Sequence, residues 1–254
     1  MLETAIEAAR QVGQVLLEEF GRPQEIKSKG LRDIVTGADL AAQARAVEVI
    51  RSWYPDHDIW GEESGQTPGG VSDYCWIVDP LDGTTNYSRG YPCFSVSIGL
   101  SYREEVILGV VYDPLHDQLF QAQRGQGAYL NNDRIHVRAV ERLIDAVVGL
   151  DWPRKQDLRC QMAQLVAEVA PRVGTLRTTG STALGLCSVA AGWIDAYFNF
   201  ALQPWDAAAA SLIIQEAGGT ISDLDGLSWH LHSVGCLASN SLIHEAMLTL
   251  LTGA

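Results

Sequence analysis

The stretch Trp76-Ile77-Val78-Asp79-Pro80-Leu81-Asp82-Gly83-Thr84-Thr85-Asn86 contains the most informative pattern in this chain of 254 residues. Its first three residues are apolar and predict a buried strand that presents Asp79 at its end. Asp82 follows three residues later, and Gly83, Thr84 and Thr85 then offer backbone amides to a neighbouring group. The sequence therefore predicts two carboxylates beside a turn of a size to hold a phosphate.

Two acids at the mouth of a core strand cost several kcal/mol of desolvation unless a positive charge compensates them. A metal ion is the simplest compensation. Oxygen ligands without a nearby histidine favour a hard ion such as Mg²⁺, or Mn²⁺, over zinc. Taken alone, Asp-x-x-Asp-Gly is also a common turn sequence, so a plain turn is the alternative at this point.

Two further acidic segments strengthen the metal interpretation. Glu62 and Glu63 lie between two glycines, and Asp206 follows Pro204-Trp205. Taken singly, the first segment would be a solvated acidic loop and the second a helix N-cap. The three segments together favour a shared cation site.

The charge balance narrows the range of partners. Eighteen Lys and Arg against 31 Asp and Glu give a formal net charge of −13, and 47% of the residues are hydrophobic. This composition excludes a disordered or collagen-like chain and predicts a surface that repels nucleic acid. An enzyme for an anionic substrate fits this charge only if bound cations reverse the local field.

The cysteines and the N-terminus indicate the cellular compartment. Five cysteines stand without a C-x-x-C pair, which argues against a disulfide framework or a zinc ribbon. The N-terminus carries acids where a secretory signal needs basic residues, and no apolar run approaches the roughly 20 residues of a membrane span. We therefore expect a soluble protein of the reducing cytoplasm without a membrane partner.

Hydrophobic spacing predicts helices over residues 6–20 and 39–53, the second with Asp39 at its start. Mostly antiparallel strands are expected over 76–78, 94–100, 106–112 and 118–121. The second half predicts strands over 146–150, 196–200, 219–222 and 235–239, and helices over 157–169, 181–192, 205–217 and after Asn240. We place a domain boundary near Glu141, which gives an N-terminal half, 1–140, and a C-terminal half, 141–254, that share an extended interface.

Beyond these patterns, the sequence resembles the inositol monophosphatase family, which belongs with fructose-1,6-bisphosphatase in a Mg²⁺-dependent, lithium-sensitive superfamily. The resemblance extends over nearly the whole chain. It is carried by Asp33-Ile34-Val35-Thr36-Gly37-Ala38-Asp39, Gly61-Glu62-Glu63-Ser64, Trp76 to Tyr87, Gly109-Val110-Val111-Tyr112-Asp113-Pro114, Gly180-Ser181, Pro204-Trp205-Asp206 and Glu216-Ala217-Gly218-Gly219. It implies an α/β fold of the α+β kind, layered as αβαβα, with the site in the crevice between the halves.

The resemblance also implies a set of metal ligands. Glu62, Asp79 and the Leu81 carbonyl would bind the first ion. Asp79, Asp82 and Asp206 would bind the second, which is also where lithium would inhibit. A third, weaker ion would share Glu62, so that two or three Mg²⁺ are expected.

The resemblance assigns the attacking water and the phosphate to neighbouring residues. Thr84 and Glu62 would orient the water, and Asp39 would either assist or only cap its helix. Gly83, Thr84 and Thr85 would hold the phosphate with their amides. Lys27 or Lys29, together with Asp33, would lie close by.

The alcohol part of the substrate would meet Asp82, Asp151, Gly180, Ser181 and Thr182. In many inositol monophosphatases a glutamate that contacts the ring hydroxyls lies seven residues before the Trp-Asp aspartate, whereas this chain has Asn199 there. Asparagine still forms hydrogen bonds but carries no charge, so selectivity would differ. Trp205 and Trp152 are candidates to line the pocket.

We therefore expect Mg²⁺-dependent hydrolysis of a small phosphate monoester of a polyol or sugar, with inositol monophosphate first. Fructose 1,6-bisphosphate, histidinol phosphate and 3′-phosphoadenosine 5′-phosphate are the alternative substrates. The resemblance also makes a homodimer the expected assembly. A hypothesis of another class is a regulatory protein-binding module, because some bacterial relatives bind the transcription machinery. His230 and His232 are expected to be a surface pair.

Overall fold

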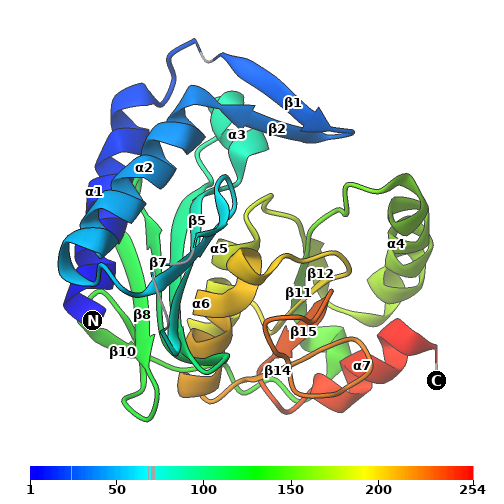
Figure 1. Ribbon diagram of the computed structural model, residues 1–254. Helices are drawn as coiled ribbons and strands as arrows, with labels where there is room; N and C mark the ends of the chain where they lie inside the picture. The colour runs from blue at the N-terminus through cyan, green and yellow to red at the C-terminus, as the bar shows by residue number, and fades with distance from the viewer. Residues whose placement is uncertain (24, 68, 70–71, 254) are drawn as a thin grey trace.

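The computed structural model describes residues 1–253 apart from positions 24, 68, 70 and 71. Five layers follow one another across the molecule (Figure 1). The helical layers are α1 (Leu2–Glu19) with α2 (Gly37–Trp53), α5 (Thr182–Ala190) with α6 (Pro204–Glu216), and α4 (Gln156–Val169) with α7 (His244–Thr252). A long sheet and a short sheet separate these three layers. The expected αβαβα layering is confirmed.

The long sheet has the strand order β10-β9-β8-β7-β6-β5-β3-β4. Its strands are β3 (Asp58–Gly61), β4 (Gly65–Thr67), β5 (Tyr74–Asp82), β6 (Ser95–Tyr102), β7 (Glu105–Asp113), β8 (Gln118–Gln123), β9 (Ala128–Leu130) and β10 (Asp133–Ile135). Neighbours are antiparallel except β3 and β5, which run parallel. The predicted antiparallel run is thus confirmed, and β5 is buried up to Asp82 because helices cover both faces of the sheet.

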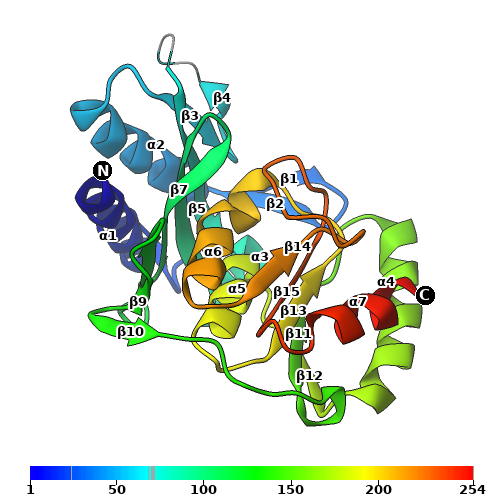
Figure 2. The ribbon, with the colours of Figure 1, turned by 90° about the horizontal axis from the view of Figure 1, so that it is seen from below.

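The short sheet has the order β12-β11-β13-β15-β14. Its strands are β11 (Val147–Leu150), β12 (Thr175–Arg177), β13 (Ala196–Asn199), β14 (Thr220–Ser222) and β15 (Cys236–Ser239). Strand β11 is parallel to β12 and β13, whereas β15 is antiparallel to β13 and β14. The view from below shows α4 and α7 on the outer face of this sheet (Figure 2).

Helix α6 packs on the long sheet although it belongs to the second half of the sequence. The alanines of residues 207–210 are completely buried. A Cβ atom on Gly109 of β7 would lie 2.2 Å from the Ala209 carbonyl oxygen, so only glycine allows this approach. The contact carries the N-terminal end of α6 to strands β5 and β6. The division of the chain near Glu141 stays a prediction.

The segment between the two predicted N-terminal helices forms a hairpin of β1 (Ile26–Gly30) and β2 (Asp33–Thr36). All five residues of β1 are exposed, so no buried face produces a periodic signal in the sequence. Strands β3, β4, β9, β10 and β12 were also not expected, because three or four residues are too few to define a period. No helix of the described residues has the length and apolar character that crossing a bilayer requires.

Helix α2 begins earlier than predicted. Thr36 is its N-cap, and Asp39 lies at the third helical position, where its Oδ2 accepts the Thr36 backbone N–H at 2.8 Å. This reciprocal arrangement is a capping box. Asp39 therefore does take part in capping its helix, but not as the first residue.

Candidate active site

Parallel pairing of β3 and β5 brings Glu62 beside Asp79. Gly61 is the register partner of Val78, and the Glu62 backbone N–H donates to the Val78 carbonyl oxygen at 3.1 Å. Glu62, directly after β3, and Asp79 of β5 therefore lie side by side in the sheet. Side-chain exposure of Glu62 is 10%, and that of Asp79 as a whole residue is 2%.

A second hydrogen bond brings Asp206 to the same edge. Ser97 of β6 is the register partner of Asp79, and its hydroxyl donates to the Trp205 carbonyl oxygen at 3.2 Å. Asp206 is the third residue of α6, and its Oδ2 accepts the Gln203 backbone N–H at 2.7 Å. The helix start thus fixes the direction of this carboxylate.

Asp82 joins the two halves of the molecule. Its Oδ2 accepts the Ala183 backbone N–H at 2.8 Å and its Oδ1 accepts that of Thr182 at 3.2 Å, both in the first turn of α5. The Ser181 hydroxyl also donates to Asp82. Burial raises the pKa of Asp82 to about 6, although these hydrogen bonds act in the opposite direction.

These acids repel one another in a dry environment. Burial, followed by the charges of Glu62, Asp82 and Asp206, raises the pKa of Asp79 well above its ordinary value. Burial also raises the pKa of Asp206 to about 8, with Asp82 and Glu62 adding to the rise. Without a cation, part of this cluster must bind protons at neutral pH.

The donor set fits a hard divalent cation, because every group is a carboxylate or carbonyl oxygen and the mutual repulsion is what a cation relieves. As the side chains stand, no three His, Cys, Asp or Glu of the described residues are grouped closely enough to enclose an ion. Backbone amides hold one oxygen each of Asp79 and Asp206, and both oxygens of Asp82.

Of the two lysines left open by the sequence, Lys29 reaches the acids. Its Nζ lies 3.0 Å from Glu62 Oε1 and 2.8 Å from Glu63 Oε1. Burial alone would lower the pKa of Lys29, but the hydrogen bonds and charges of the two glutamates outweigh it and raise the pKa. Lys27 instead pairs with Glu25 at the exposed surface.

Asp39 and Thr84 lie together behind the acids. The Thr84 hydroxyl is 3.1 Å from both Asp39 Oδ1 and the Leu81 carbonyl oxygen. Burial raises the pKa of Asp39, and the Glu62 charge adds a smaller rise, which places Asp39 within electrostatic reach of the site. Asp33, by contrast, lies on the hairpin and pairs with Arg154.

Gly83 begins the short helix α3 (Thr84–Ser88) in a left-handed conformation with φ of 99°. A Cβ atom there would lie 3.1 Å from the Cys93 carbonyl oxygen, so the turn requires glycine. The first hydrogen bond of α3 runs from the Tyr87 N–H to the Gly83 carbonyl oxygen at 3.0 Å. The N–H groups of Gly83, Thr84 and Thr85 come before the Tyr87 N–H in the chain, so they are not donors in this helical hydrogen bond.

The residues expected near the alcohol are buried, apart from the exposed Gly180, and hydrogen bonds join them. Asp151 Oδ1 accepts the Gly180 N–H at 2.8 Å, and its Oδ2 accepts the Tyr197 hydroxyl at 2.8 Å. The Asn199 amide donates to the Thr182 hydroxyl oxygen at 3.3 Å. Tyr197 was not predicted as a site residue, because a tyrosine in an apolar strand is typical of the hydrophobic core.

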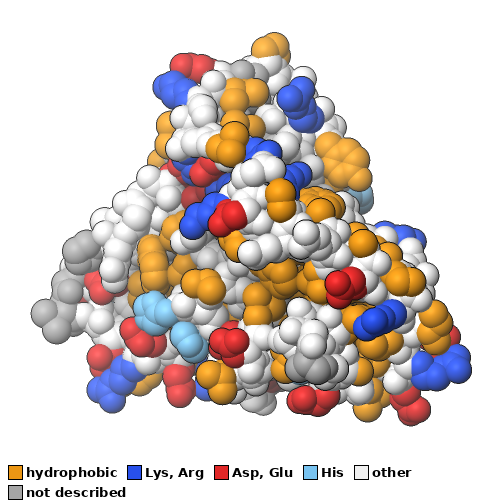
Figure 3. Space-filling view, turned by 90° about the vertical axis from the view of Figure 1, so that its right-hand side faces the viewer, with side chains coloured by type: hydrophobic (Ala, Val, Ile, Leu, Met, Phe, Trp, Pro, Cys, Tyr) orange, Lys and Arg blue, Asp and Glu red, His pale blue; other side chains and the backbone are white. Residues whose placement is uncertain are grey.

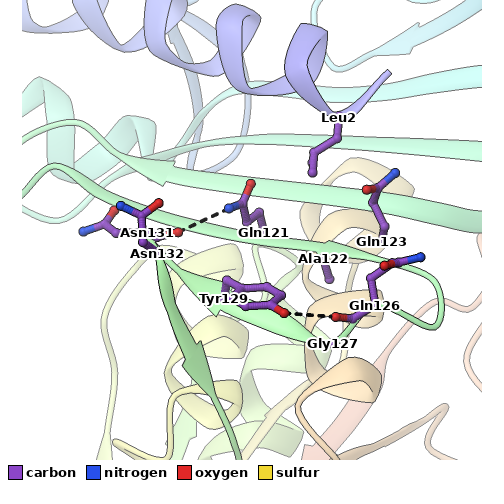
Figure 4. Close-up of a pocket in the computed structure, with 9 residues that line it drawn as sticks. All are labelled: Leu2, Gln121, Ala122, Gln123, Gln126, Gly127, Tyr129, Asn131 and Asn132. Atoms are coloured by element: carbon purple, nitrogen blue, oxygen red, sulfur yellow. Dashed lines mark hydrogen bonds between the residues drawn. The ribbon is translucent and has the colours of Figure 1, made fainter.

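Two cavities lie away from the acids. One of about 340 Å³ is lined by Leu2, Gln121, Ala122, Gln123, Gln126, Gly127, Tyr129, Asn131 and Asn132 (Figure 4). None of these lining residues has a carboxylate, unlike the acids around Asp79. The other, of about 200 Å³, adjoins His230 and His232. These histidines are an exposed pair in a loop rather than on a strand.

The tryptophans near the site differ in exposure. Trp205 packs edge-on against Trp60 of β3, with ring centroids 6.2 Å apart. Trp152 is 37% exposed, and the Arg159 guanidinium lies 5.3 Å from its ring centroid. Trp205 is thus held beside Asp206, whereas Trp152 lies at the surface.

Comparison with known proteins identifies the family. A model of the inositol monophosphatase family matches residues 1–253. A Haemophilus influenzae protein named Nus factor SuhB is 42% identical over 252 residues, which cover 98% of this chain and 94% of that protein. The crystal structure of extragenic suppressor protein suhB from Bartonella henselae has a TM-score of 0.94 at 34% identity, covering 98% of this chain and 97% of that one. The IMPase of Thermotoga maritima has a TM-score of 0.92 at 34% identity, covering 99% and 96%. The chain therefore belongs to the inositol monophosphatase family.

Proposed function

We propose that this protein hydrolyses a small phosphate monoester in the presence of Mg²⁺, and that inositol monophosphate is the first substrate to test. One observation carries the proposal: the pairing of β3 with β5 and the hydrogen bond from Ser97 to Trp205 bring Glu62 and Asp206 to the buried Asp79 and Asp82. Members of the family are generally Mg²⁺-dependent, which supports the same reaction class.

The oxygen ligands divide naturally into two sets. Glu62, Asp79 and the Leu81 carbonyl would hold one ion, and Asp79, Asp82 and Asp206 would hold another, with a third ion sharing Glu62. Mn²⁺ satisfies the same ligands. When bound, such ions neutralise the phosphate, acidify water and stabilise the departing oxygen.

The residues behind these acids would position the reactants. The Thr84 hydroxyl, within hydrogen-bond distance of Asp39, would orient the attacking water together with Glu62. The amides of Gly83, Thr84 and Thr85 would bind phosphate oxygens. Direct attack by water requires no covalent intermediate, so no nucleophilic side chain is needed.

The alcohol would lie toward Asp151, Asn199 and the segment Gly180-Ser181-Thr182. Because Asn199 is neutral, a polyol, a sugar or a second charged group is acceptable at this position. Fructose 1,6-bisphosphate, histidinol phosphate and 3′-phosphoadenosine 5′-phosphate are therefore alternative substrates to inositol monophosphate.

The test is phosphate release from a panel of these esters with and without millimolar Mg²⁺. We expect release only with Mg²⁺, inhibition by lithium, and loss of release in Asp82→Asn. Asp133→Asn, an exposed acid on β10, is the matched control and should retain activity. Release that is independent of Mg²⁺, or unchanged in Asp82→Asn, would contradict the proposal.

A second candidate function is a regulatory protein-binding role. It is favoured by the name Nus factor given to the Haemophilus influenzae relative. The net charge of −13 suits docking on a basic protein rather than on RNA. No release from any ester, together with saturable binding of a basic transcription protein, would favour this role. A homodimer in the cytoplasm is the expected setting for either function.

A further inference from the structure

The tip of the β1–β2 hairpin is attached to the loop that precedes α4. Arg32, in the turn of the hairpin, donates to the Arg154 carbonyl oxygen at 3.1 Å and to Gln156 Oε1 at 2.7 Å. The Arg154 side chain points back and places Nη1 2.9 Å from Asp33 Oδ1. In Figure 1 the hairpin extends over the molecule toward this loop.

This attachment places a cation at the edge of the acidic site. Arg154 follows Asp151 by three residues, and Asp151 accepts the N–H of Gly180, whose neighbour Ser181 donates to Asp82. The Arg154 side chain is 55% exposed, so a ligand from solvent can reach it. Figure 3 shows basic side chains gathered between the upper, hairpin end of the molecule and the body below.

The loop holds its shape without the Arg154 side chain. Arg159 of α4 donates to the Pro153 carbonyl oxygen at 3.2 Å, and its guanidinium lies 5.3 Å from the Trp152 ring centroid. On the other side, Arg32 binds a main-chain atom of Arg154 rather than its side chain. The guanidinium of Arg154 is thus displayed by a supported loop, and its removal should not unfold that loop.

The guanidinium of Arg154 is also poorly engaged. Its one ion-pair partner among the described residues is Asp33, whose Oδ1 is buried yet accepts no hydrogen bond, so the Arg154–Asp33 pair is poorly aligned. A phosphate or carboxylate on a ligand can offer a bidentate contact, which is stronger. Asn199, where many family members have a glutamate, adds no negative charge to repel such a group.

Resting on the proposed function, we propose that Arg154 determines specificity by binding a second anionic group, a phosphate or a carboxylate, on the alcohol part of the substrate. The second anion replaces Asp33 at the guanidinium. The preferred substrates are then phosphate monoesters that carry a further negative charge at the end remote from the reacting phosphate. Neutral polyol phosphates are turned over less efficiently.

The test compares matched substrates that differ only in the second anion. Fructose 1,6-bisphosphate is paired with fructose 1-phosphate, and 3-phosphoglycerate with glycerol 3-phosphate, which separates a second phosphate from a carboxylate. Wild type is compared with Arg154→Met and with Arg142→Met. Arg142 precedes the opposite end of β11, is 73% exposed and serves as the charge-matched control. KM, kcat and the dissociation constant from calorimetry are measured for each pair.

We expect the wild type to bind at least one charged substrate about tenfold more tightly than its neutral partner, with Arg154→Met removing that preference and changing kcat less than about threefold. Arg142→Met should behave as wild type. An equal rise of KM for both members of a pair in Arg154→Met, or no preference in the wild type, would overturn the inference. Calorimetry measures whether Arg154 binds the second anion even if no ester is hydrolysed. A lack of hydrolysis would count against the proposed function but not against the role of Arg154.

Discussion

The acids around Asp79 and the hairpin above them are held by different forces. Asp79 and Asp82 are buried and Asp206 is half-buried, and backbone amides fix each of them. Strand β1 is exposed along its whole length, and polar pairs attach the hairpin to its surroundings. Substitution is costly in the first region, whereas weak contacts hold the second. We therefore expect the acids to decide whether a phosphate ester is hydrolysed, and the hairpin with its loop to decide which one.

The largest effect should come from Asp79→Asn. Asp79 belongs to both proposed metal sets, so we expect phosphate release to fall on the order of 10³-fold. The same change removes a buried charge that its neighbours repel, so metal-free protein should become more stable by about 1–3 kcal/mol. Activity assays and denaturant unfolding measure the two effects.

Asp133→Asn provides the control, because this exposed acid should alter neither quantity. A loss of both activity and metal-free stability in Asp79→Asn would show that this carboxylate supports the fold. The acids around Asp79 would then stabilise the metal-free fold rather than repel one another within it.

The next effect is the pH dependence of metal-free stability. The pKa of Asp206 is raised from 3.8 to about 8 and that of Asp82 to about 6, so the folded state keeps protons that the unfolded state releases. Stability is therefore full below about pH 4 and falls as pH rises toward 8, by on the order of a few kcal/mol. Unfolding of chelator-treated protein at several pH values measures this slope.

Mg²⁺ should remove most of the slope, because a cation stabilises the ionised carboxylates that protons would otherwise neutralise. Asp206→Asn should flatten the metal-free profile in the same way. A metal-free protein whose stability rises between pH 5 and 8 would mean that the acids are already compensated by protein groups, with Lys29 the nearest candidate.

Lys29 is the contact between the two regions and should have an intermediate effect. Its ammonium group lies 3.0 Å from Glu62 Oε1, an atom that a cation would also use. Lys29→Met should therefore lower the Mg²⁺ concentration for half-maximal activity by about three- to tenfold. Lys27→Met, in the same strand but paired with Glu25, is the matched control and should leave the Mg²⁺ titration unchanged.

If Lys29→Met instead requires more Mg²⁺ for half-maximal activity, the prediction is wrong. Lys29 would then hold Glu62 in place for the metal, and the hairpin would be part of the acidic centre.

The two regions also differ in how far the sequence predicted them. Strand β5, which contains Asp79, and the helix that begins before Asp206 have strong apolar patterns, so the acids could be located along the chain and their layers anticipated. Their convergence rested on the family resemblance, because the Ser97 to Trp205 hydrogen bond that brings α6 to β5 has no sequence signal. No rule of spacing would have joined those residues.

The hairpin could not be predicted for a related reason. Its strand β1 has no buried face, and its partners Glu62, Arg154 and Gln156 are 33 to 124 residues away in the sequence. The choice between Lys27 and Lys29 also required the structure, since both lysines are exposed polar residues in the same short segment. Arg154 was not predicted as a site residue, because nothing in the sequence indicates that it lies beside Asp33.

The smallest effect on stability should come from Arg32→Met, which tests how weakly the hairpin is held. The variant loses the hydrogen bonds to the Arg154 carbonyl oxygen and to Gln156, both at the surface, so the free energy of unfolding should change by less than about 1 kcal/mol. Amide exchange in residues 26–36 should nevertheless become several-fold faster, because the hairpin tip is then released while the core is intact. Arg22→Met, which removes an exposed arginine outside the hairpin, should leave exchange in that segment unchanged. A destabilisation above about 2 kcal/mol would place the hairpin among the elements that hold the fold, since surface pairs do not contribute that much.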